Sequence, residues 1–285
     1  MSILVHKAGI GKTTGQKSNP SRTTEDGSTI DHLQPDFMSF FDPSSGITTS
    51  GGTTTWSPSS GASSLKLRLF NSPSVTSGPP SYISFDGSDD HIGPTSTGYG
   101  GNPIKLDNVY WTIGFWAYAK WSTNTTHLLG AFNYFGVEDV TIPGFYIQVD
   151  NVGDMIVIGA NNLDSISASN TTLLDNKWSF ISLSYETGVY YLYVNGRFVA
   201  SGNNPDTLSS SSALFSPLTF GAYPPSTGFD PLFNGNSTLR LGRIYYFRTA
   251  VLADRLLASK HRFLFLASHD MHNGKYYGSD VASYV

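Results

Sequence analysis

The stretch WSFISLSYETGVYYLYVNGRFVASG, residues 178–202, decides the fold. Apolar and aromatic residues recur at every second position along most of it, which is typical of β-strands with two different faces. The pair Asn195-Gly196 separates two of the runs. This pair favours the type I′ turn of a tight hairpin, because both central positions of that turn need a positive φ. The stretch therefore predicts two or three antiparallel strands joined by short turns.

Each strand of this stretch presents two sets of side chains. Trp178 and Phe180 alternate with Ile181 and Leu183, so the two pairs face opposite sides of a sheet. One set must fill a core, and the other meets solvent, a ligand or a partner protein. Packing of aromatic side chains between neighbouring strands is the ordinary way in which a sheet is stabilised. The alternative is a platform on which sugars or a partner stack.

Ten short runs of this kind follow one another between residues 82 and 250. Gly, Asn, Asp and Pro lie between the runs, and these residues favour turns. Many short strands separated by turns are typical of sandwiches and jelly rolls. We therefore predict an all-β fold, a two-sheet antiparallel jelly roll over residues 80–250. The runs are YISFD (82–86), TIGFWAYA (112–119), HLLGAF (127–132), GFYIQVD (144–150), DMIVIGA (154–160), WSFISLSY (178–185), VYYLYVN (189–195), RFVAS (197–201), LTFGAY (218–223) and LRLGRIYYFRTA (239–250).

The composition excludes several classes of function. Charged residues make up only 13% of the 285 residues, the net charge is −4, and Lys and Arg form no run, so binding to nucleic acid through a basic patch is not expected. The chain has no Cys, which removes disulfides and thiolate metal sites. No apolar run approaches the roughly 20 residues that span a bilayer, so membrane insertion is not expected.

The first 79 residues differ from the rest of the chain. From residue 41 to residue 64, 19 of 24 residues are Ser, Thr, Gly or Pro. Such a segment buries too little apolar surface to offset its conformational entropy. We therefore predict that residues 1–79 form an extended low-complexity arm, held by a partner protein in a large assembly or by copies of the same chain. Its expected assembly anchors are Phe37, Phe40, Phe41 and Trp56.

Residues 251–285 are predicted to hold one helix and a C-terminal tail. Leu252, Leu256, Leu257 and Phe263 recur at helical spacing within VLADRLLASKHRFLF.

Four segments, in this order, carry a family pattern: YISFDGSDDHIG, WTIGFWAYAKW, KWSFISLSYETGVYYLYVNGRFVASG and LGRIYYFRTAVLADRLL. They resemble the opening strand and turn, the aromatic strand, the main hairpin, and the last strand with the helix after it, of the laminin-G-like, concanavalin A-like jelly rolls. The resemblance covers residues 81–265. It implies the fold but not the activity, because this fold serves lectins, hydrolases, adhesion modules and virion proteins alike.

A sugar-binding surface is one function that this fold permits. Trp116, Tyr118, Tyr191 and Tyr193 are the candidates for stacking on a host surface glycan or on a partner. The alternative is that these rings only pack against one another.

Glycoside hydrolysis is not expected. The reaction needs two carboxylates that flank one bond, and the glucanases of this fold carry Glu residues close together on one strand. This chain has only three Glu, and no two of them share a predicted run: Glu25, Glu138 and Glu186. We predict no catalytic residues.

Three aspartates cluster in the predicted turn after residue 85. Asp86, Asp89 and Asp90 offer the carboxylate oxygens that Ca²⁺ prefers, and related modules often hold calcium at the rim of the sandwich. The alternative is that Asp-Gly and Ser-Asp-Asp only form the turn. No other cofactor is expected.

Two hypotheses about function follow from these features. The first is a non-enzymatic virion structural protein, as a capsid decoration, fibre or tail component, which is anchored by its arm and displays the jelly roll for host glycan attachment. The second is a free carbohydrate-binding module or lectin.

Overall fold

The computed structural model describes somewhat less than half of the chain, and every described element is a β-strand. The described residues are 37–61, 65–78, 80–94, 105–106, 110–119, 126–132, 144–149, 156–159, 166–168, 178–186, 189–203, 216–221 and 239–247. Among them there is no helix, so none that is long and apolar enough to cross a membrane.

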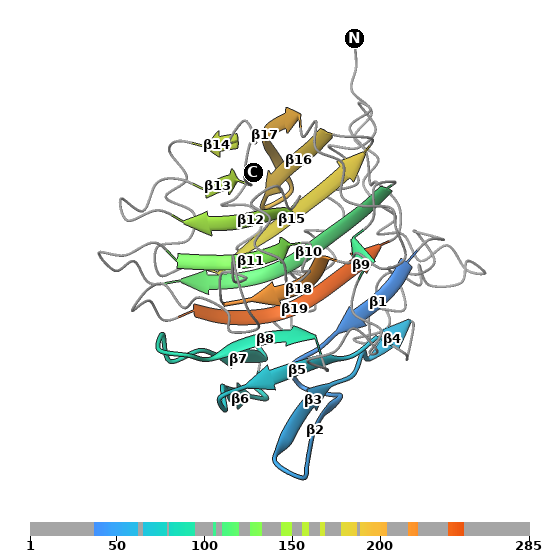
Figure 1. Ribbon diagram of the computed structural model, residues 1–285, viewed down its shortest axis with the longest axis vertical. Helices are drawn as coiled ribbons and strands as arrows, with labels where there is room; N and C mark the ends of the chain where they lie inside the picture. The colour runs from blue at the N-terminus through green and yellow to red at the C-terminus, as the bar shows by residue number, and fades with distance from the viewer. Residues whose placement is uncertain are drawn as a thin grey trace, which may run out of the picture.

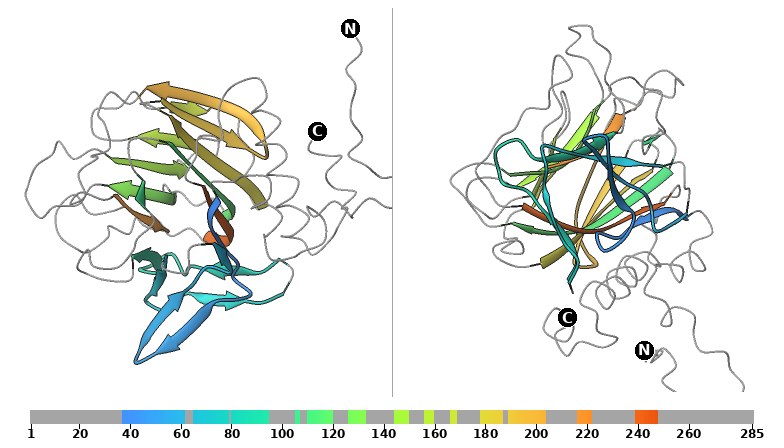
Figure 2. Two further views of the ribbon diagram at one scale, coloured as in Figure 1. Left: turned by 90° about the vertical axis from the view of Figure 1, so that its right-hand side faces the viewer. Right: turned by 90° about the horizontal axis from the view of Figure 1, so that it is seen from below.

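The strands form two antiparallel sheets that pack face to face (Figures 1 and 2). In order across sheet A lie β17 (Arg197–Asn203), β16 (Val189–Val194), β15 (Trp178–Glu186), β10 (Tyr110–Ala119), β19 (Leu239–Phe247), β1 (Phe37–Phe41) and β4 (Ser60–Gly61), with β7 (Tyr82–Ser84) beside β19 and β6 (Ser74–Thr76) beside β7. In order across sheet B lie β14 (Ile166–Ala168), β13 (Ile156–Gly159), β12 (Gly144–Val149), β11 (Thr126–Phe132), β18 (Ser216–Phe220), β8 (His91–Pro94), β5 (Leu67–Phe70), β3 (Thr53–Trp56) and β2 (Ile47–Ser50), with β9 (Lys105–Leu106) beside β18. The predicted jelly-roll sandwich is confirmed.

The main core lies between the two sheets. Phe115 of β10 meets Phe220 of β18 edge to face, with ring centroids 5.4 Å apart. Along β15, Ile181 and Leu183 point into this core, as their alternation with Phe180 predicts. Each of the ten predicted runs overlaps one strand of the sandwich.

The predicted hairpin turn at Asn195-Gly196 is confirmed. Asn195 has a φ of 50° and Gly196 a φ of 73°, the values that a type I′ turn requires. Asn195 also extends the pairing of β16 with β15, because its side-chain oxygen accepts a hydrogen bond of 2.8 Å from the backbone N–H of Phe180 in β15. The turn therefore fixes the register of β15 on β16.

The predicted arm is wrong for residues 37–78, because these residues form β1 to β6 of the same sandwich. Phe40 and Phe41 of β1 pair with Tyr245 and Ile244 of β19. Trp56 of β3 is buried in the main core, where its ring lies 5.4 Å from that of Phe41.

The physical reason is that a few buried apolar side chains suffice when the backbone pairs with a sheet. The buried residues Phe40, Phe41, Trp56, Leu67 and Leu69, together with backbone pairing to β19 and β8, hold a Ser- and Thr-rich segment in place. Phe37 pairs with Phe247, so all four expected anchors lie in strands of their own sandwich: Phe37, Phe40, Phe41 and Trp56.

Two other predictions fall on parts of the chain outside the described residues. These are the arm over residues 1–36 and the helix and tail over residues 251–285.

Candidate functional site

The four predicted stacking residues all lie on the outer face of sheet A, the face turned away from sheet B. Strand register places them there, since Tyr193 pairs with Ser182 and Tyr191 with Ser184. They do not form one exposed platform. Trp116 is only 1% exposed and Tyr193 only 2% exposed, so the prediction that these two rings stack on a ligand is wrong. Tyr191 and Tyr118 are half-buried.

Trp116 is buried because it belongs to a second aromatic cluster, on the outer face itself. We call this cluster the buried aromatic layer, and its residues come from β1, β10, β15 and β19. The Trp116 ring lies 5.5 Å from that of Phe180, which in turn lies 6.0 Å from Tyr245. The members of the layer are Phe40, Trp116, Phe180, Tyr245 and Phe247.

An ion pair closes one side of this layer. The guanidinium of Arg243 donates to the Asp42 carboxylate from Nε and lies 2.8 Å from the same oxygen through Nη2. Both side chains are almost completely buried, and the guanidinium also lies 5.9 Å from the Phe40 ring. Burial raises the pKa of Tyr245 far above its ordinary value, although the neighbouring Arg243 opposes this shift.

Tyr118 belongs instead to a half-exposed group that sequence reasoning did not assemble. Strand register lines up Ser84, Arg240, Tyr118 and Trp178 across β7, β19, β10 and β15. Tyr82 lies on the same face as Ser84, two residues earlier in β7. We call Tyr82, Tyr118, Trp178 and Arg240 the aromatic row.

The rings of the aromatic row gather around one guanidinium. The Arg240 guanidinium carbon lies 5.1 Å from the centre of the Tyr82 ring and 4.8 Å from that of Tyr118. The Trp178 ring is 5.8 Å from Tyr82 and 5.7 Å from Tyr118. All four side chains are half-buried, so part of each ring and of the cation reaches solvent. Rings of this kind stack on apolar faces of ligands, and an arginine fork binds planar anions.

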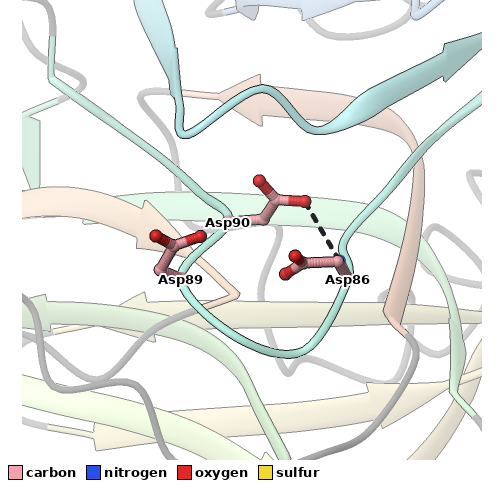
Figure 3. Close-up of side chains that lie close together, drawn as sticks. All are labelled: Asp86, Asp89 and Asp90. Atoms are coloured by element: carbon pink, nitrogen blue, oxygen red, sulfur yellow. Dashed lines mark hydrogen bonds between the residues drawn. The ribbon is translucent and has the colours of Figure 1, made fainter.

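The three predicted metal-binding aspartates do come together, in the turn between β7 and β8 (Figure 3). One carboxylate oxygen of each lies within 4.8 Å of the others. The turn uses two of these carboxylates, since Asp90 accepts from the backbone N–H of Asp86 at 3.0 Å and Asp86 accepts from that of Ser88 at 2.8 Å. Gly87 has a φ of 82°, which favours glycine. We call Asp86, Asp89 and Asp90 the acidic turn.

The charge of the acidic turn is not balanced by a cation of the turn itself. Burial raises the pKa of Asp90, and the carboxylates of Asp86 and Asp89 raise it further, against the effect of the Asp86 backbone N–H. Three carboxylates this close fit part of the oxygen shell of Ca²⁺. The alternative, a turn-forming role, is also met by the hydrogen bonds above, and one set of side chains can serve both.

The acidic turn is braced from sheet B. Asn71, at the end of β5, donates from its side-chain amide to the backbone carbonyl of Asp89 at 2.7 Å. The same carbonyl accepts from Nδ1 of His91 at 3.1 Å, and the His91 ring stacks on Phe70 with centroids 4.3 Å apart. Burial lowers the pKa of His91, so the neutral ring is favoured there.

Sequence reasoning missed Tyr82, Trp178 and Arg240 as partners of Tyr118. One signal was present, because Arg240 is a cation within a strand that is otherwise mostly apolar. The pairing of β7 with β19 joins parts of the chain far apart in sequence, and the sequence pattern alone does not show that register.

Comparison with known proteins agrees with the architecture. The model of the family described as the concanavalin A-like lectin/glucanases superfamily matches residues 86–245. No curated protein matches the sequence.

Among solved structures, similar folds occur in a toxin and in a sialidase. The binding domain of botulinum neurotoxin serotype D matches with a TM-score of 0.54 at 15% identity, over 81% of this chain and 51% of that one. Trypanosoma rangeli sialidase in complex with sialic acid matches with a TM-score of 0.60 at 14% identity, over 84% of this chain and 34% of that one. This chain thus spans about half of the toxin domain and a third of the sialidase, and identities this low show the fold alone.

Proposed function

Because the chain belongs to the concanavalin A-like lectin/glucanases superfamily, we propose that it is a non-enzymatic carbohydrate-binding domain displayed on a virion, as a capsid decoration, fibre or tail component. The carbohydrate-binding fold is the part that the family match establishes. The aromatic row is the observation that carries the binding role. Its half-exposed rings lie on one face and leave part of their surface to a ligand.

The carboxylates of the described residues support a role without catalysis. They are Asp42, Glu186 and the three residues of the acidic turn. Asp42 is committed to Arg243, and Glu186 pairs with Tyr110 at the end of β15, next to the turn into β16. The acidic turn holds its carboxylates on one loop, whereas a glycosidase places two carboxylates on either side of the scissile bond.

The acidic turn fits a supporting role in binding. A Ca²⁺ ion held by Asp86, Asp89 and Asp90 would offset the repulsion among the three carboxylates, and it would stiffen the loop between β7 and β8. β7 also carries Tyr82, so order in this loop would extend to the aromatic row.

The virion placement rests on sequence. Thirty-six residues precede β1, which begins at residue 37. They carry few large apolar side chains, a composition that suits a segment which folds against other virion proteins or other copies of this chain.

A glycan microarray tests the binding role. We expect the full chain to bind a defined set of sugars, and Trp178→Ala to lose at least tenfold in affinity through the loss of stacking area. Phe198→Ala is the matched control, because Phe198 is an aromatic residue of sheet A that is 53% exposed and lies outside the aromatic row. Equal binding by Trp178→Ala and the wild type would contradict the proposed site.

The supporting roles have tests of their own. Ca²⁺ is expected to raise the melting temperature over that in chelator, and Asp89→Asn is expected to abolish the rise; an unchanged wild type would remove calcium from the proposal.

The virion placement is tested by labelling purified particles with an antibody to this chain. Sugar binding by a chain that is absent from particles would favour the free lectin, and release of reducing sugar from a polysaccharide would contradict the non-enzymatic role.

A further inference from the structure

We propose that the aromatic row selects a carboxylated sugar, with Arg240 as the residue that binds the sugar's carboxylate. The inference rests on the proposed carbohydrate-binding function and adds the class of ligand. It divides the work of the site in two. The rings of Tyr82, Tyr118 and Trp178 hold the apolar face of a pyranose, and the guanidinium distinguishes an acidic sugar from a neutral one.

The position of Arg240 within the sheet supports this division. It pairs with Ser84 on one side and with Tyr118 on the other, so its side chain rises from the middle of four neighbouring strands. Contacts with two ring faces, at 5.1 and 4.8 Å, restrict where the guanidinium lies before any ligand binds. A fork held in this way loses less entropy when it forms two parallel hydrogen bonds to a carboxylate.

The charge of Arg240 is available to a ligand. Among the described residues it forms no ion pair, whereas Arg243, three residues later on the same strand, is closed by Asp42 at 2.8 Å. Arg240 is also half-buried, and an interaction with a ligand carboxylate is stronger there than in open solvent. Hydrogen bonds to charged groups are stronger than those between neutral groups. The two arginines of β19 thus differ in use: Arg243 forms a structural ion pair with Asp42, and Arg240 binds the ligand carboxylate.

The surroundings set the range over which the charge acts. The acidic turn begins at Asp86, two residues beyond Ser84 of β7, and the whole chain carries a net charge of −4. Both repel an approaching anion. Selection therefore depends on short, direct hydrogen bonds to Arg240 rather than on long-range attraction, and it should weaken only modestly between low and physiological salt.

The test compares pairs of ligands that differ only in charge. Oligosaccharides that end in a uronic acid or in a sialic acid are each compared with their carboxyl-reduced, neutral counterparts, by titration against the full-length chain. We expect the wild type to favour at least one acidic ligand by roughly tenfold or more. The two sugar series distinguish which carboxylated pyranose fits.

Three variants locate the effect. Arg240→Gln is expected to bind acidic and neutral sugars alike, at the affinity that the wild type has for the neutral one. Arg240→Lys, which keeps the charge but loses the fork, is expected to retain part of the preference. Arg68→Gln is the matched control, because Arg68 also lies over an aromatic ring, that of Phe70 at 4.5 Å, but in sheet B. It should keep the full preference.

Other outcomes separate this inference from the proposed function. If the wild type binds neutral and acidic sugars equally, the ligand class is wrong while carbohydrate binding stands. If Arg240→Gln and Arg240→Lys lose both ligands equally while melting like the wild type, Arg240 shapes the rings and does not bind the carboxylate. If the wild type binds no sugar of either series, the proposed function fails, and the inference fails with it.

Discussion

The outer face of sheet A carries two groups of aromatic side chains that look alike in sequence and differ in depth. The buried aromatic layer, with Trp116 and Phe180, is closed to solvent. The aromatic row, with Tyr118 and Trp178, lies two residues along the same two strands and is half-exposed. The first group has five rings and the Arg243–Asp42 ion pair beside them. The second has three rings around Arg240, which forms no ion pair with any residue that the structure describes. Position along a strand thus separates fully buried aromatic residues from half-exposed ones.

The largest effect is expected inside the buried aromatic layer. Phe180→Ala should lower the free energy of unfolding by roughly 3–5 kcal/mol, because it removes a fully buried ring and leaves a cavity among Trp116 and Tyr245. Urea unfolding followed by tryptophan fluorescence measures the change. A loss below about 1 kcal/mol would show that the layer is not a core, and would contradict the distinction between the buried aromatic layer and the aromatic row.

A smaller effect is expected from overfilling the same layer. A Cβ at Gly114 would lie 2.6 Å from Cζ of Phe180, so Gly114→Ala should cost about 1–3 kcal/mol. In the Phe180→Ala background the obstructing ring is absent, and the cost of Gly114→Ala should disappear. A double-mutant cycle measures this coupling. Additive costs would mean that the two residues do not meet.

Alkaline pH should distinguish the hydroxyl of the buried layer. Because burial raises the pKa of Tyr245, the folded state keeps its proton above pH 10, where an unfolded tyrosine loses it. The unfolded state then binds fewer protons, so stability falls as pH rises, by up to about 1.4 kcal/mol per pH unit from this group. Tyr245→Phe should show a shallower fall between pH 10 and 11 in urea midpoints. Parallel profiles for the variant and the wild type would contradict the assignment.

The smallest effect on stability is expected in the aromatic row. Trp178→Ala should cost less than Phe180→Ala and about 1–2 kcal/mol at most, because Trp178 is already part-exposed when folded. Its loss of sugar binding should be the larger effect. Thermal unfolding and ligand titration on one preparation give both values. A stability loss equal to that of Phe180→Ala would place Trp178 in the core.

Local sequence signals predicted the strands and the central hairpin, because those depend on alternation and on the turn residues Asn195 and Gly196. The acidic turn was also predictable, since Asp86, Asp89 and Asp90 are close in sequence. The exposure of side chains on the outer face could not be predicted from the sequence. It depends on which strands lie side by side, and Trp116 and Tyr118 have the same alternation but different neighbours.

The arm was mispredicted for a related reason. The count of Ser, Thr, Gly and Pro describes residues 41–64 alone. The strands of this region are held in place by pairing with β19 and β8, which come later in the chain. Arg240 was overlooked because its role appears only when β7, β19 and β10 are placed side by side.

The pairing of β1 with β19 has a consequence for how the protein is made. Asp42 and Arg243 are 201 residues apart, and β19 lies between β10 on one side and β1 and β7 on the other. At the roughly 5–20 residues per second of protein synthesis, β1 leaves the ribosome about 10–40 seconds before its partner exists. During that interval the strand and its three phenylalanines have no sheet to join. The sandwich therefore closes only after β19 has been synthesised, and a chain interrupted before that point exposes an unpaired strand that can pair with other chains.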